Sequence, residues 1–396
     1  CPRRRKRRLP RSIFGTMNML TPQTEAELAA IVAKAEASFR VLGGGTRPIG
    51  AASNATGLTT RALSGVELYE PGALTLVVKA GTPLAEVEAL LASEGQRLPF
   101  EPMDHRGVLG TTGEPTIGAV FAANVSGPRR IQAGAARDYL LGVRFVDGQG
   151  QVLRNGGRVM KNVTGYDLVK LMAGSFGTLG VLTEVALKVL PDTATTATLT
   201  LPDLEDAMAV KALSRALGSP FEVTGAAHRP SGPEGRPLTL LRLEGSEKSV
   251  AYRAAELTKV LEPFGNLQVM HDTASSAEIW RDISDVAPFH NVDGDVWRLS
   301  VTPSDAPGVV AQIPGAKALY DWGGGLIWLL VPEGTPPEKV RAPLAATGGH
   351  ATLIRGANTG VAFQPLDPNV EALQRGLRHK FDPRGVFNPG LMGHTA

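Results

Sequence analysis

Three consecutive glycines, Gly43–Gly45, follow a short apolar run and precede Thr46. Consecutive glycines leave backbone N–H groups free to converge on an anion, and a threonine hydroxyl adds another donor. Neither familiar phosphate motif is present. No Lys-Ser/Thr pair follows the glycines, and no helix with Gly-x-Gly-x-x-Gly spacing begins there. Taken alone, the segment therefore favours a tight turn, and phosphate binding depends on the rest of the chain.

Two further segments are rich in small residues and could expose backbone to the same ligand. Glu114–Arg130 combines small residues that admit a flat group with the polar side chains of Thr116, Asn124 and Ser126. Ser175–Glu184 is a glycine turn that leads into a strand, whose backbone could pair with a heteroaromatic edge. Three such separated segments suit one large dinucleotide that lies across a domain.

Residues that commonly bind metals are scattered. The single cysteine is Cys1, which excludes internal disulfides and an iron–sulfur cluster held by this chain. No pair of histidines has a spacing such as His-x-x-x-His. We therefore expect no metal site. The histidines outside the N-terminal half are His228, His271, His290, His350, His379 and His394.

The elements around the glycines alternate between helix and strand. A helix is predicted over residues 21–38, with Thr21 as its cap, and a strand over 39–43. A second strand (74–81) and helix (83–95) follow, the helix opened by proline and closed by glycine. Residues 96–137 show no regular pattern, and loops of this length are usually functional or disordered.

The rest of the chain divides near residue 192. Residues 140–157 read as a hairpin around Asp147-Gly148, and 181–191 as a half-buried strand. Beyond this point two successive β–α–β patterns predict an antiparallel sheet with helices on one face. A helix and a Pro/Gly/Asn-rich extension close the chain.

Length and charge limit the possible function classes. The 396 residues suit two or three domains, and no run of about 18 apolar residues could span a bilayer. The net charge of +3 is misleading, because residues 1–11 hold seven of the 41 basic residues. The remainder has 34 basic and 38 acidic residues, a balance that argues against nucleic-acid binding by the body. The basic segment could bind nucleic acid or anionic lipid, act as a targeting signal, or precede a start at Met17 or Met19.

Taken in order, the motifs resemble a known family. "VLGGGT", "PTIGAVFAAN", "SGPRR", "KNVTGYDLVKLMAGSFGTLGVLTEVALKVLP" and the terminal "FDPRGVFNPGLM" are similar to the FAD-binding domain of the vanillyl-alcohol-oxidase type. Within that superfamily the pattern most resembles the family of the FAD-binding E subunit of bacterial glycolate oxidase. The resemblance is strong over residues 19–191, weaker in the following domain, and strong again over the last stretch.

The resemblance implies an α+β fold. A PCMH-type FAD-binding domain of two α/β subdomains would occupy residues 19–191, and an antiparallel-sheet cap domain with helices on one face would occupy 192–372. Residues 373–396 would return to the FAD domain, and residues 1–18 would form a basic disordered tail.

The same resemblance implies which residues contact FAD. The glycine loop would hold the pyrophosphate, the second segment would continue the phosphate and flavin contacts, and the third would meet the adenine and ribose. The flavin would be non-covalent, because the loop offers no tethering side chain and His105 reads as a loop histidine. The implied contacts are Gly43, Gly44, Gly45, Thr46, Arg47, Thr116, Ile117, Gly118, Asn124, Gly127, Pro128, Gly177, Thr178, Gly180, Val181, Leu182 and Asn388.

Catalytic residues are harder to assign. Oxidation of a 2-hydroxy acid requires a base for the hydroxyl and a cation for the carboxylate. Catalytic relatives carry a metal motif resembling Gly-Asp-Gly-Asn-x-His, whereas residues 292–300 here read "VDGDVWRLS". Arg281 and Arg298 are candidates for the cation, and Tyr166 and Lys161 for groups near the flavin. Outward display on a strand is an alternative for Arg298, as is packing for Tyr166.

These features imply an FAD-dependent oxidoreductase acting on CH–OH groups within a complex. The leading hypothesis is a flavin subunit of glycolate oxidase or dehydrogenase, which oxidises glycolate to glyoxylate. Its partners would be a second flavin subunit and an iron–sulfur subunit. The expected location is cytoplasmic, with only peripheral contact to the inner membrane through partners. A stand-alone flavin oxidoreductase for 2-hydroxy acids or alcohols and a non-catalytic structural flavin subunit are the alternatives.

Overall fold

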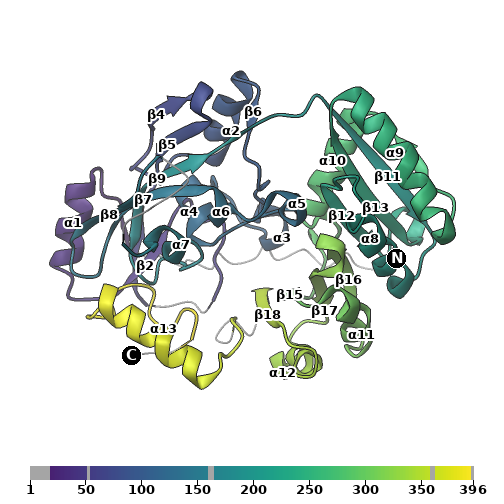
Figure 1. Cartoon of the computed structure of the whole chain (residues 1–396). Helices are drawn as coiled ribbons and strands as arrows, with labels where there is room; N and C mark the ends of the chain where they lie inside the picture. Colours follow the sequence, from purple (N-terminus) through teal and green to yellow (C-terminus); the bar gives the residue numbers. More distant parts are fainter. Residues whose placement is uncertain (1–17, 51–53, 159–164, 357–361, 394–396) are drawn as a thin grey trace, which may run out of the picture.

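The computed structural model describes residues 18–50, 54–158, 165–356 and 362–393; the basic N-terminal segment, Lys161 and His394 lie outside them. Figure 1 shows the arrangement of the helices. They are α1 (Glu25–Ala33), α2 (Leu84–Ser93), α3 (Arg106–Leu109), α4 (Ile117–Ala122), α5 (Arg130–Ala133), α6 (Ala136–Tyr139), α7 (Leu168–Met172), α8 (Asp206–Leu217), α9 (Glu247–Leu261), α10 (Thr273–Ser284), α11 (Ala306–Ala311), α12 (Pro337–Arg341) and α13 (Pro368–Phe381).

A small parallel sheet begins the fold. Its strand order is β1 (Met19–Leu20), β3 (Thr56–Thr59), β2 (Phe39–Leu42). Leu28 and Val32 of α1, four residues apart on one helix face, are fully buried in the core beside this sheet. The helix begins later than predicted, because Thr24 rather than Thr21 is the cap and accepts a hydrogen bond from Glu27 N at 3.1 Å.

A five-stranded antiparallel sheet completes the first half of the chain. Its order is β4 (Val66–Glu70), β5 (Thr75–Lys79), β9 (Val181–Lys188), β7 (Leu140–Val146), β8 (Val152–Gly156). The predicted hairpin is confirmed as β7–β8, and Asp147 Oδ1 accepts hydrogen bonds from the backbone of Gln149 and Gln151 in its turn. A short pair, β6 (Gln96–Arg97) with β10 (Leu190–Pro191), lies where the chain leaves this sheet.

Residues 96–137 contain more regular structure than the sequence suggested. They hold β6 and the short helices α3 to α6, each of which has four to six residues. The apolar run within Glu114–Arg130 forms α4, whose Ile117 and Phe121 are fully buried. Helix α4 therefore anchors this otherwise partly exposed segment in the domain core.

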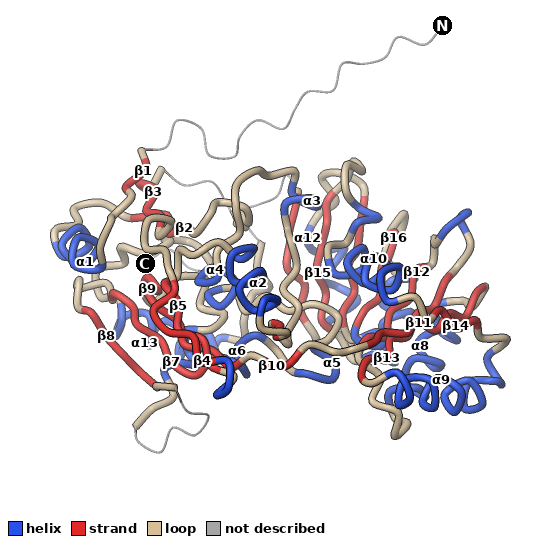
Figure 2. The backbone as a smooth tube through the Cα atoms, turned by 90° about the horizontal axis from the view of Figure 1, so that it is seen from above, coloured by secondary structure: helices blue, strands red, loops and turns tan. Residues whose placement is uncertain are grey.

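The predicted antiparallel cap sheet is confirmed and has eight strands. Their order is β14 (Gln268–Met270), β11 (Thr195–Pro202), β13 (Leu238–Gly245), β12 (Gly225–Arg229), β16 (Lys317–Asp321), β17 (Leu326–Val331), β15 (Asp295–Ser300), β18 (His350–Arg355). Every strand pairing is antiparallel. Figure 2 shows this sheet at the opposite end of the molecule from β7, β8 and β9. The fold is thus of the α+β class that the resemblance implied.

A buried ion-pair network joins the two halves. Glu244 of β13 accepts hydrogen bonds from Arg129 Nη2 and Arg97 Nη1, each at 2.8 Å. Glu101 accepts two from Arg242, at 2.8 and 2.9 Å. Because these arginines and carboxylates come from both halves, the network fixes the cap sheet against residues 97–130.

Candidate functional site

The glycine loop follows β2 and packs against the segment that starts at Glu114. A Cβ atom on Gly44 would lie 1.6 Å from Glu114 O, and one on Gly43 would lie 2.3 Å from Thr116 Oγ1. No side chain fits at those distances. Gly45 differs, because it has φ +74° and open space around its Cβ position. The first two glycines thus permit close contact between segments, and the third permits the turn.

The third segment reaches the same place through Asn388. Its Oδ1 accepts a hydrogen bond from Val41 N at 2.8 Å, and its Nδ2 donates to Phe176 O at 2.9 Å and to Gly177 O at 3.2 Å. The buried amide therefore ties β2 to the turn that precedes β9. Since the protein backbone already engages both amide atoms, Asn388 positions the site rather than facing a ligand.

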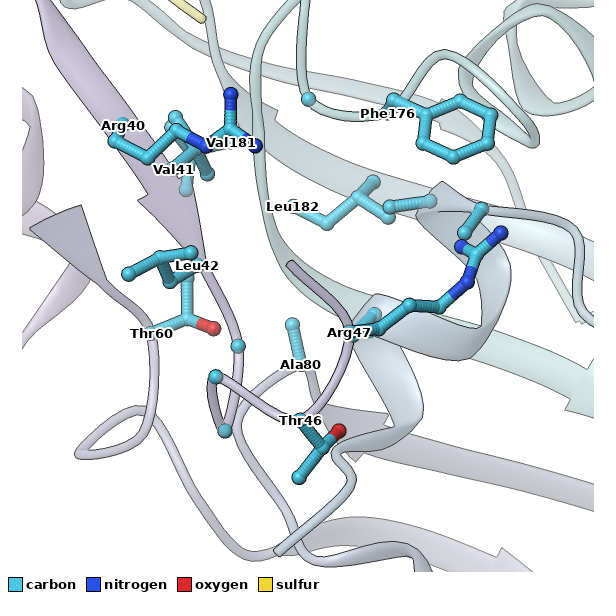
Figure 3. A pocket seen from close by; sticks show the side chains of 18 of the residues that line it. Arg40, Val41, Leu42, Thr46, Arg47, Thr60, Ala80, Phe176, Val181 and Leu182 are labelled. Atoms are coloured by element: carbon cyan, nitrogen blue, oxygen red, sulfur yellow. The ribbon is translucent and has the colours of Figure 1, made fainter. Parts of the chain in front are cut away.

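A cavity of about 830 Å³, the glycine-lined cavity, opens where these three segments meet (Figure 3). The predicted contacts that line it are Gly43, Gly44, Gly45, Thr46, Arg47, Gly118, Gly177, Gly180, Val181 and Leu182. Arg40, Thr60, Ala80, Phe176 and Leu391 line it as well and were not anticipated from the sequence.

The other predicted contacts lie outside this cavity. Ile117 belongs to the core, and Thr178 Oγ1 donates to Ser175 O at 2.7 Å. Gly127 O accepts a hydrogen bond from Trp322 Nε1 at 3.0 Å, so Gly127 and the adjoining buried Pro128 lie against the cap. Thr116 is buried and its hydroxyl oxygen has no hydrogen-bond partner among the described residues. That orphaned oxygen lies beside the backbone of Gly43.

Arg40 gives the glycine-lined cavity a buried positive charge. Its guanidinium donates a hydrogen bond to Ile49 O and forms no salt bridge within 4 Å to a carboxylate of the described residues. Burial lowers the pKa of Arg40 from its usual value. Arg40 lies on a strand with its side chain pointing inward, and a single arginine in a strand belongs to no recognisable sequence motif. The sequence therefore did not reveal its role.

A second, larger cavity of about 1720 Å³, the arginine-lined cavity, adjoins the first. The two share Arg47, Ala123 and Phe176. Arg130 comes from α5 and Arg298 from β15, so both halves of the molecule contribute walls. Asn124, another predicted contact, lines this cavity and not the first.

Four arginines line this cavity, and three of them, Arg47, Arg130 and Arg298, form no salt bridge within 4 Å to a carboxylate of the described residues. Arg47 stacks on Phe176 at 5.0 Å, while Arg130 and Arg298 lie over the Trp322 ring at 4.6 and 5.1 Å. Burial, and then the charge of Arg298, lowers the pKa of Arg47 to about 9. Burial, and then Arg130, lowers that of Arg298 to about 10. All remain cationic at neutral pH, so the cavity is suited to an anion.

Two histidines lie beside these cations. Burial and Arg47 hold the pKa of His105 well below its usual value, and Arg47 Nε donates to His105 Nε2 at 3.1 Å. His350 also lines the cavity, where burial followed by Arg298 and Arg130 lowers its pKa. Both rings are therefore neutral at pH 7. Of the two, His350, which is exposed at the start of β18, makes no side-chain hydrogen bond to the described residues, so its ring is available to accept a proton.

The remaining catalytic candidates lie elsewhere. Tyr166 is 87% exposed at the surface. Arg281 lines a different cavity, together with Glu88, Asp104 and Asp285. Lys161 lies outside the described residues, and of the other three candidates the structure brings only Arg298 to the arginine-lined cavity.

Neither a metal cluster nor a membrane-spanning helix is present in the described ranges. No three His, Cys, Asp or Glu side chains gather there as metal ligands would. None of the helices in that part of the chain is long and apolar enough to cross a membrane.

Comparison with known proteins places this site in context. The model of the "FAD binding domain" family matches residues 18–156. Glycolate oxidase subunit GlcE of Escherichia coli is 37% identical over 85% of this chain and 86% of that protein. Glycolate oxidase subunit GlcD of Bacillus subtilis is 35% identical over 32% of this chain and 25% of its own length. A solved structure of alkyldihydroxyacetonephosphate synthase, 18% identical, superimposes with a TM-score of 0.69 over 94% of this chain and 76% of that one, which shows a shared fold.

Proposed function

The chain belongs to the family of the FAD-binding E subunit of glycolate oxidase, and from this premise we propose that it binds FAD and takes part in oxidising glycolate to glyoxylate as one subunit of a complex. The observation that carries the proposal is the pair of adjoining cavities. One is lined by backbone and small residues, the other by unpaired arginines, and Arg47 belongs to both. A dinucleotide and a carboxylate substrate need these two environments side by side.

The residues of the glycine-lined cavity fit FAD. The backbone of Gly43–Gly45 and the buried guanidinium of Arg40 would hold the pyrophosphate, with the orphaned Thr116 hydroxyl as a further polar group beside them. The small residues Gly118, Gly177 and Gly180 would admit the flat ring systems. Among the described residues that line this cavity there is no histidine or cysteine, which supports non-covalent binding.

The arginine-lined cavity would hold the substrate. When bound, FAD supplies the acceptor for the hydride from the carbinol carbon. Arg298 and Arg130 would bind the glycolate carboxylate, since both are cationic and neither has a carboxylate partner. The neutral imidazole of His350 would accept the hydroxyl proton. Electrons would then pass to a partner subunit that carries an iron–sulfur cluster, and membrane contact would be peripheral through such partners.

Flavin retention and its dependence on Gly44 provide the test. We expect purified protein to carry flavin absorbance, and acid precipitation to release all FAD into the supernatant. Gly44→Ala should lose most of the flavin, because its Cβ would overlap the Glu114 carbonyl. Gly72→Ala is the matched control, since its Cβ position has open space. Equal flavin content in both variants would contradict the assignment of this loop.

Turnover separates the proposed subunit from its alternatives. We expect the assembled complex to reduce a dye with glycolate and His350→Gln to slow that reduction at least 100-fold while retaining FAD. Rapid glycolate turnover by the isolated chain would indicate a stand-alone oxidoreductase. A complex that keeps its full rate when this chain carries Arg298→Met and His350→Gln would assign the chain a structural role.

A further inference from the structure

Three residues line both the glycine-lined cavity and the arginine-lined cavity, namely Arg47, Ala123 and Phe176. With FAD in the first cavity and the substrate in the second, the hydride must pass where the two cavities meet. Arg47 is the charged member of the three. Figure 3 shows its side chain extending from the glycine loop toward the Phe176 ring. Its charge therefore lies where both ligands would meet.

His105 orients the guanidinium of Arg47 without neutralising it. The histidine is 7% exposed, and its Nε2 accepts the Nε–H of Arg47 at 3.1 Å. Because Nε2 accepts, the neutral ring carries its hydrogen on Nδ1, and a hydrogen bond to the backbone of Met103 also holds the ring. An aspartate or glutamate in this place would pair with Arg47 and cancel its charge. A neutral acceptor fixes the orientation and leaves the full charge to act on a ligand.

The rest of the Arg47 guanidinium is available to ligands. Its Nε is used for His105, which leaves the four hydrogens on its two Nη atoms. Among the described residues, no acceptor or carboxylate engages either Nη atom, and neither atom is buried. The Phe176 ring lies 5.0 Å from the guanidinium carbon and covers one face of the group. The free edge is a planar fork of donors, which suits carboxylate or phosphate oxygens.

The glycine loop is fastened to the segment around His105 by a separate contact. His105 precedes helix α3, and its carbonyl accepts a hydrogen bond from Leu109 N at 3.0 Å. Beyond the helix, Thr111 Oγ1 donates to Thr46 O at 2.7 Å, so the peptide that leads into Arg47 is held independently of the arginine side chain. The contact between Arg47 and His105 is therefore not needed to hold the loop. What it determines is the orientation of the guanidinium.

Phe176 supports Arg47 from the other side. Its backbone has φ +54°, a conformation that a bulky residue rarely adopts. Two hydrogen bonds maintain it, from Phe176 N to Ala122 O at 2.8 Å and from Asn388 Nδ2 to Phe176 O at 2.9 Å. The ring packs edge-on against Phe363, with the centroids 5.0 Å apart. Backbone strain of this kind persists where the surroundings over-determine it, and here it keeps the ring against Arg47.

We propose that His105 is a positioning residue, which holds Arg47 so that this one cation acts on both FAD and substrate during oxidation. The inference rests on the proposed function, which assigns the two cavities to these ligands. The hydride takes two electrons and one proton from the carbinol carbon to the flavin, and the hydroxyl proton passes to His350. The flavin thereby gains one negative charge. A cation fixed at the boundary stabilises that charge and attracts the substrate carboxylate.

The midpoint potential of the FAD-loaded full chain tests this role, because a nearby cation favours the reduced flavin. We expect Arg47→Met to lower the equilibrium constant of reduction about 10-fold, which is about 30 mV for a two-electron couple. His105→Leu removes the acceptor and should lower this constant at least 3-fold. His105→Gln keeps an acceptor oxygen and should stay within 2-fold of the wild type. His271→Leu, at an exposed histidine that lines neither cavity, is the matched control and should also stay within 2-fold.

A double-mutant cycle separates positioning from a general structural role. In the Arg47→Met background, His105→Leu should change the equilibrium constant by less than 2-fold, because the histidine then has no guanidinium to orient. An equal effect of His105→Leu in both backgrounds would overturn the proposal. An unchanged potential in Arg47→Met would overturn it as well, even if His105→Leu does not retain FAD.

Oxalate binding provides a second readout, since oxalate carries carboxylates and cannot donate a hydride. Titration is followed by the flavin absorbance of the full chain. We expect Arg47→Met and His105→Leu to weaken binding at least 3-fold, and His105→Gln to match the wild type. Unchanged affinity in all three variants would overturn the proposed contact with substrate. A wild-type chain that takes up no FAD would refute the proposed function and this inference with it, whereas a chain that retains FAD with the same potential in every variant would overturn this inference alone.

Discussion

Two groups of three arginines lie at the boundary between the first half of the chain and the cap sheet, and they differ in their partners. Arg97, Arg129 and Arg242 share the carboxylates of Glu101 and Glu244. Arg47, Arg130 and Arg298 line a cavity and have aromatic rings and a neutral histidine beside them. The first group fixes the domains together, and the second group is free to bind an anion.

Arg129 and Arg130 show how sharply the two groups separate. The side chain of Arg129 is desolvated, yet Glu101 and Glu244 raise its pKa above the usual value. Burial lowers the pKa of Arg130, its immediate neighbour. A buried charge without a counter-ion destabilises the fold. Its retention in a cavity is therefore better explained by ligand binding than by stability.

The largest expected effect comes from breaking the paired group. Glu244→Gln would leave three arginines with too little negative charge, and breaking a buried pair typically costs about 3–5 kcal/mol. We expect the free energy of unfolding to fall by that amount in urea titration. Glu247→Gln, at the start of α9, is the control and should change it by less than about 0.5 kcal/mol. A small loss for Glu244→Gln would show that the network contributes little to domain docking.

The sequence predicted the secondary structure and the domain organisation better than it predicted which arginines are paired with carboxylates. The glycine loop, the hairpin and the two β–α–β patterns were predictable because turn residues and apolar periodicity are local properties. The different partners of Arg129 and Arg130 could not be predicted, because the two side chains are identical and adjacent in the sequence. They differ only because Glu244, over a hundred residues away, packs against Arg129. For the same reason, the sequence offered Arg281 and Arg298 as equivalent candidates for the substrate-binding cation. Only the tertiary structure shows that they line different cavities.

Asp321 lies close to arginines of both groups, and its titration should make the stability of the protein depend on pH. Burial, and then the nearby Glu101, raises its pKa to about 7, although Trp322 N donates to its Oδ1 and Arg242 and Arg298 are close. Between about pH 4 and 7 the folded protein therefore holds a proton that the unfolded chain has released, so stability falls as pH rises. The slope for one such group is up to about 1.4 kcal/mol per pH unit.

Asp321→Asn should remove this slope. Between pH 5 and 7 we expect the wild type to lose on the order of 2 kcal/mol more of unfolding free energy than the variant. Chemical denaturation of both proteins at the two pH values measures it. Parallel pH profiles would mean that Asp321 is already ionised in the fold and belongs electrostatically with the arginines of the cavity.

Substitution in the group without carboxylate partners (Arg47, Arg130 and Arg298) should affect the free energy of unfolding differently from substitution in the paired group. Arg298→Met removes a buried charge that has no carboxylate partner, so we expect unfolding free energy to stay the same or rise by about 1 kcal/mol. Glycolate binding to the flavin-loaded protein should weaken about 10- to 100-fold, which corresponds to a lost charge-assisted contact. Glycolamide, which lacks the carboxylate charge, is the matched ligand and should bind both proteins equally. Destabilisation of several kcal/mol would place Arg298 with the structural arginines.

Arg130 offers the finest test of the comparison, because it and Arg298 share one indole ring. Arg130→Gln loses a cation–π contact of about 0.5–1 kcal/mol but relieves repulsion of Arg298, so the net change in stability should be within about 0.5 kcal/mol. If both arginines hold one carboxylate, Arg130→Gln should weaken glycolate binding several-fold, and much less when Arg298 is already Met. A double-mutant cycle with the four proteins measures that coupling directly. Additive losses would mean that the two cations act on separate groups of the ligand, and that the cavity is built for more than one negative charge.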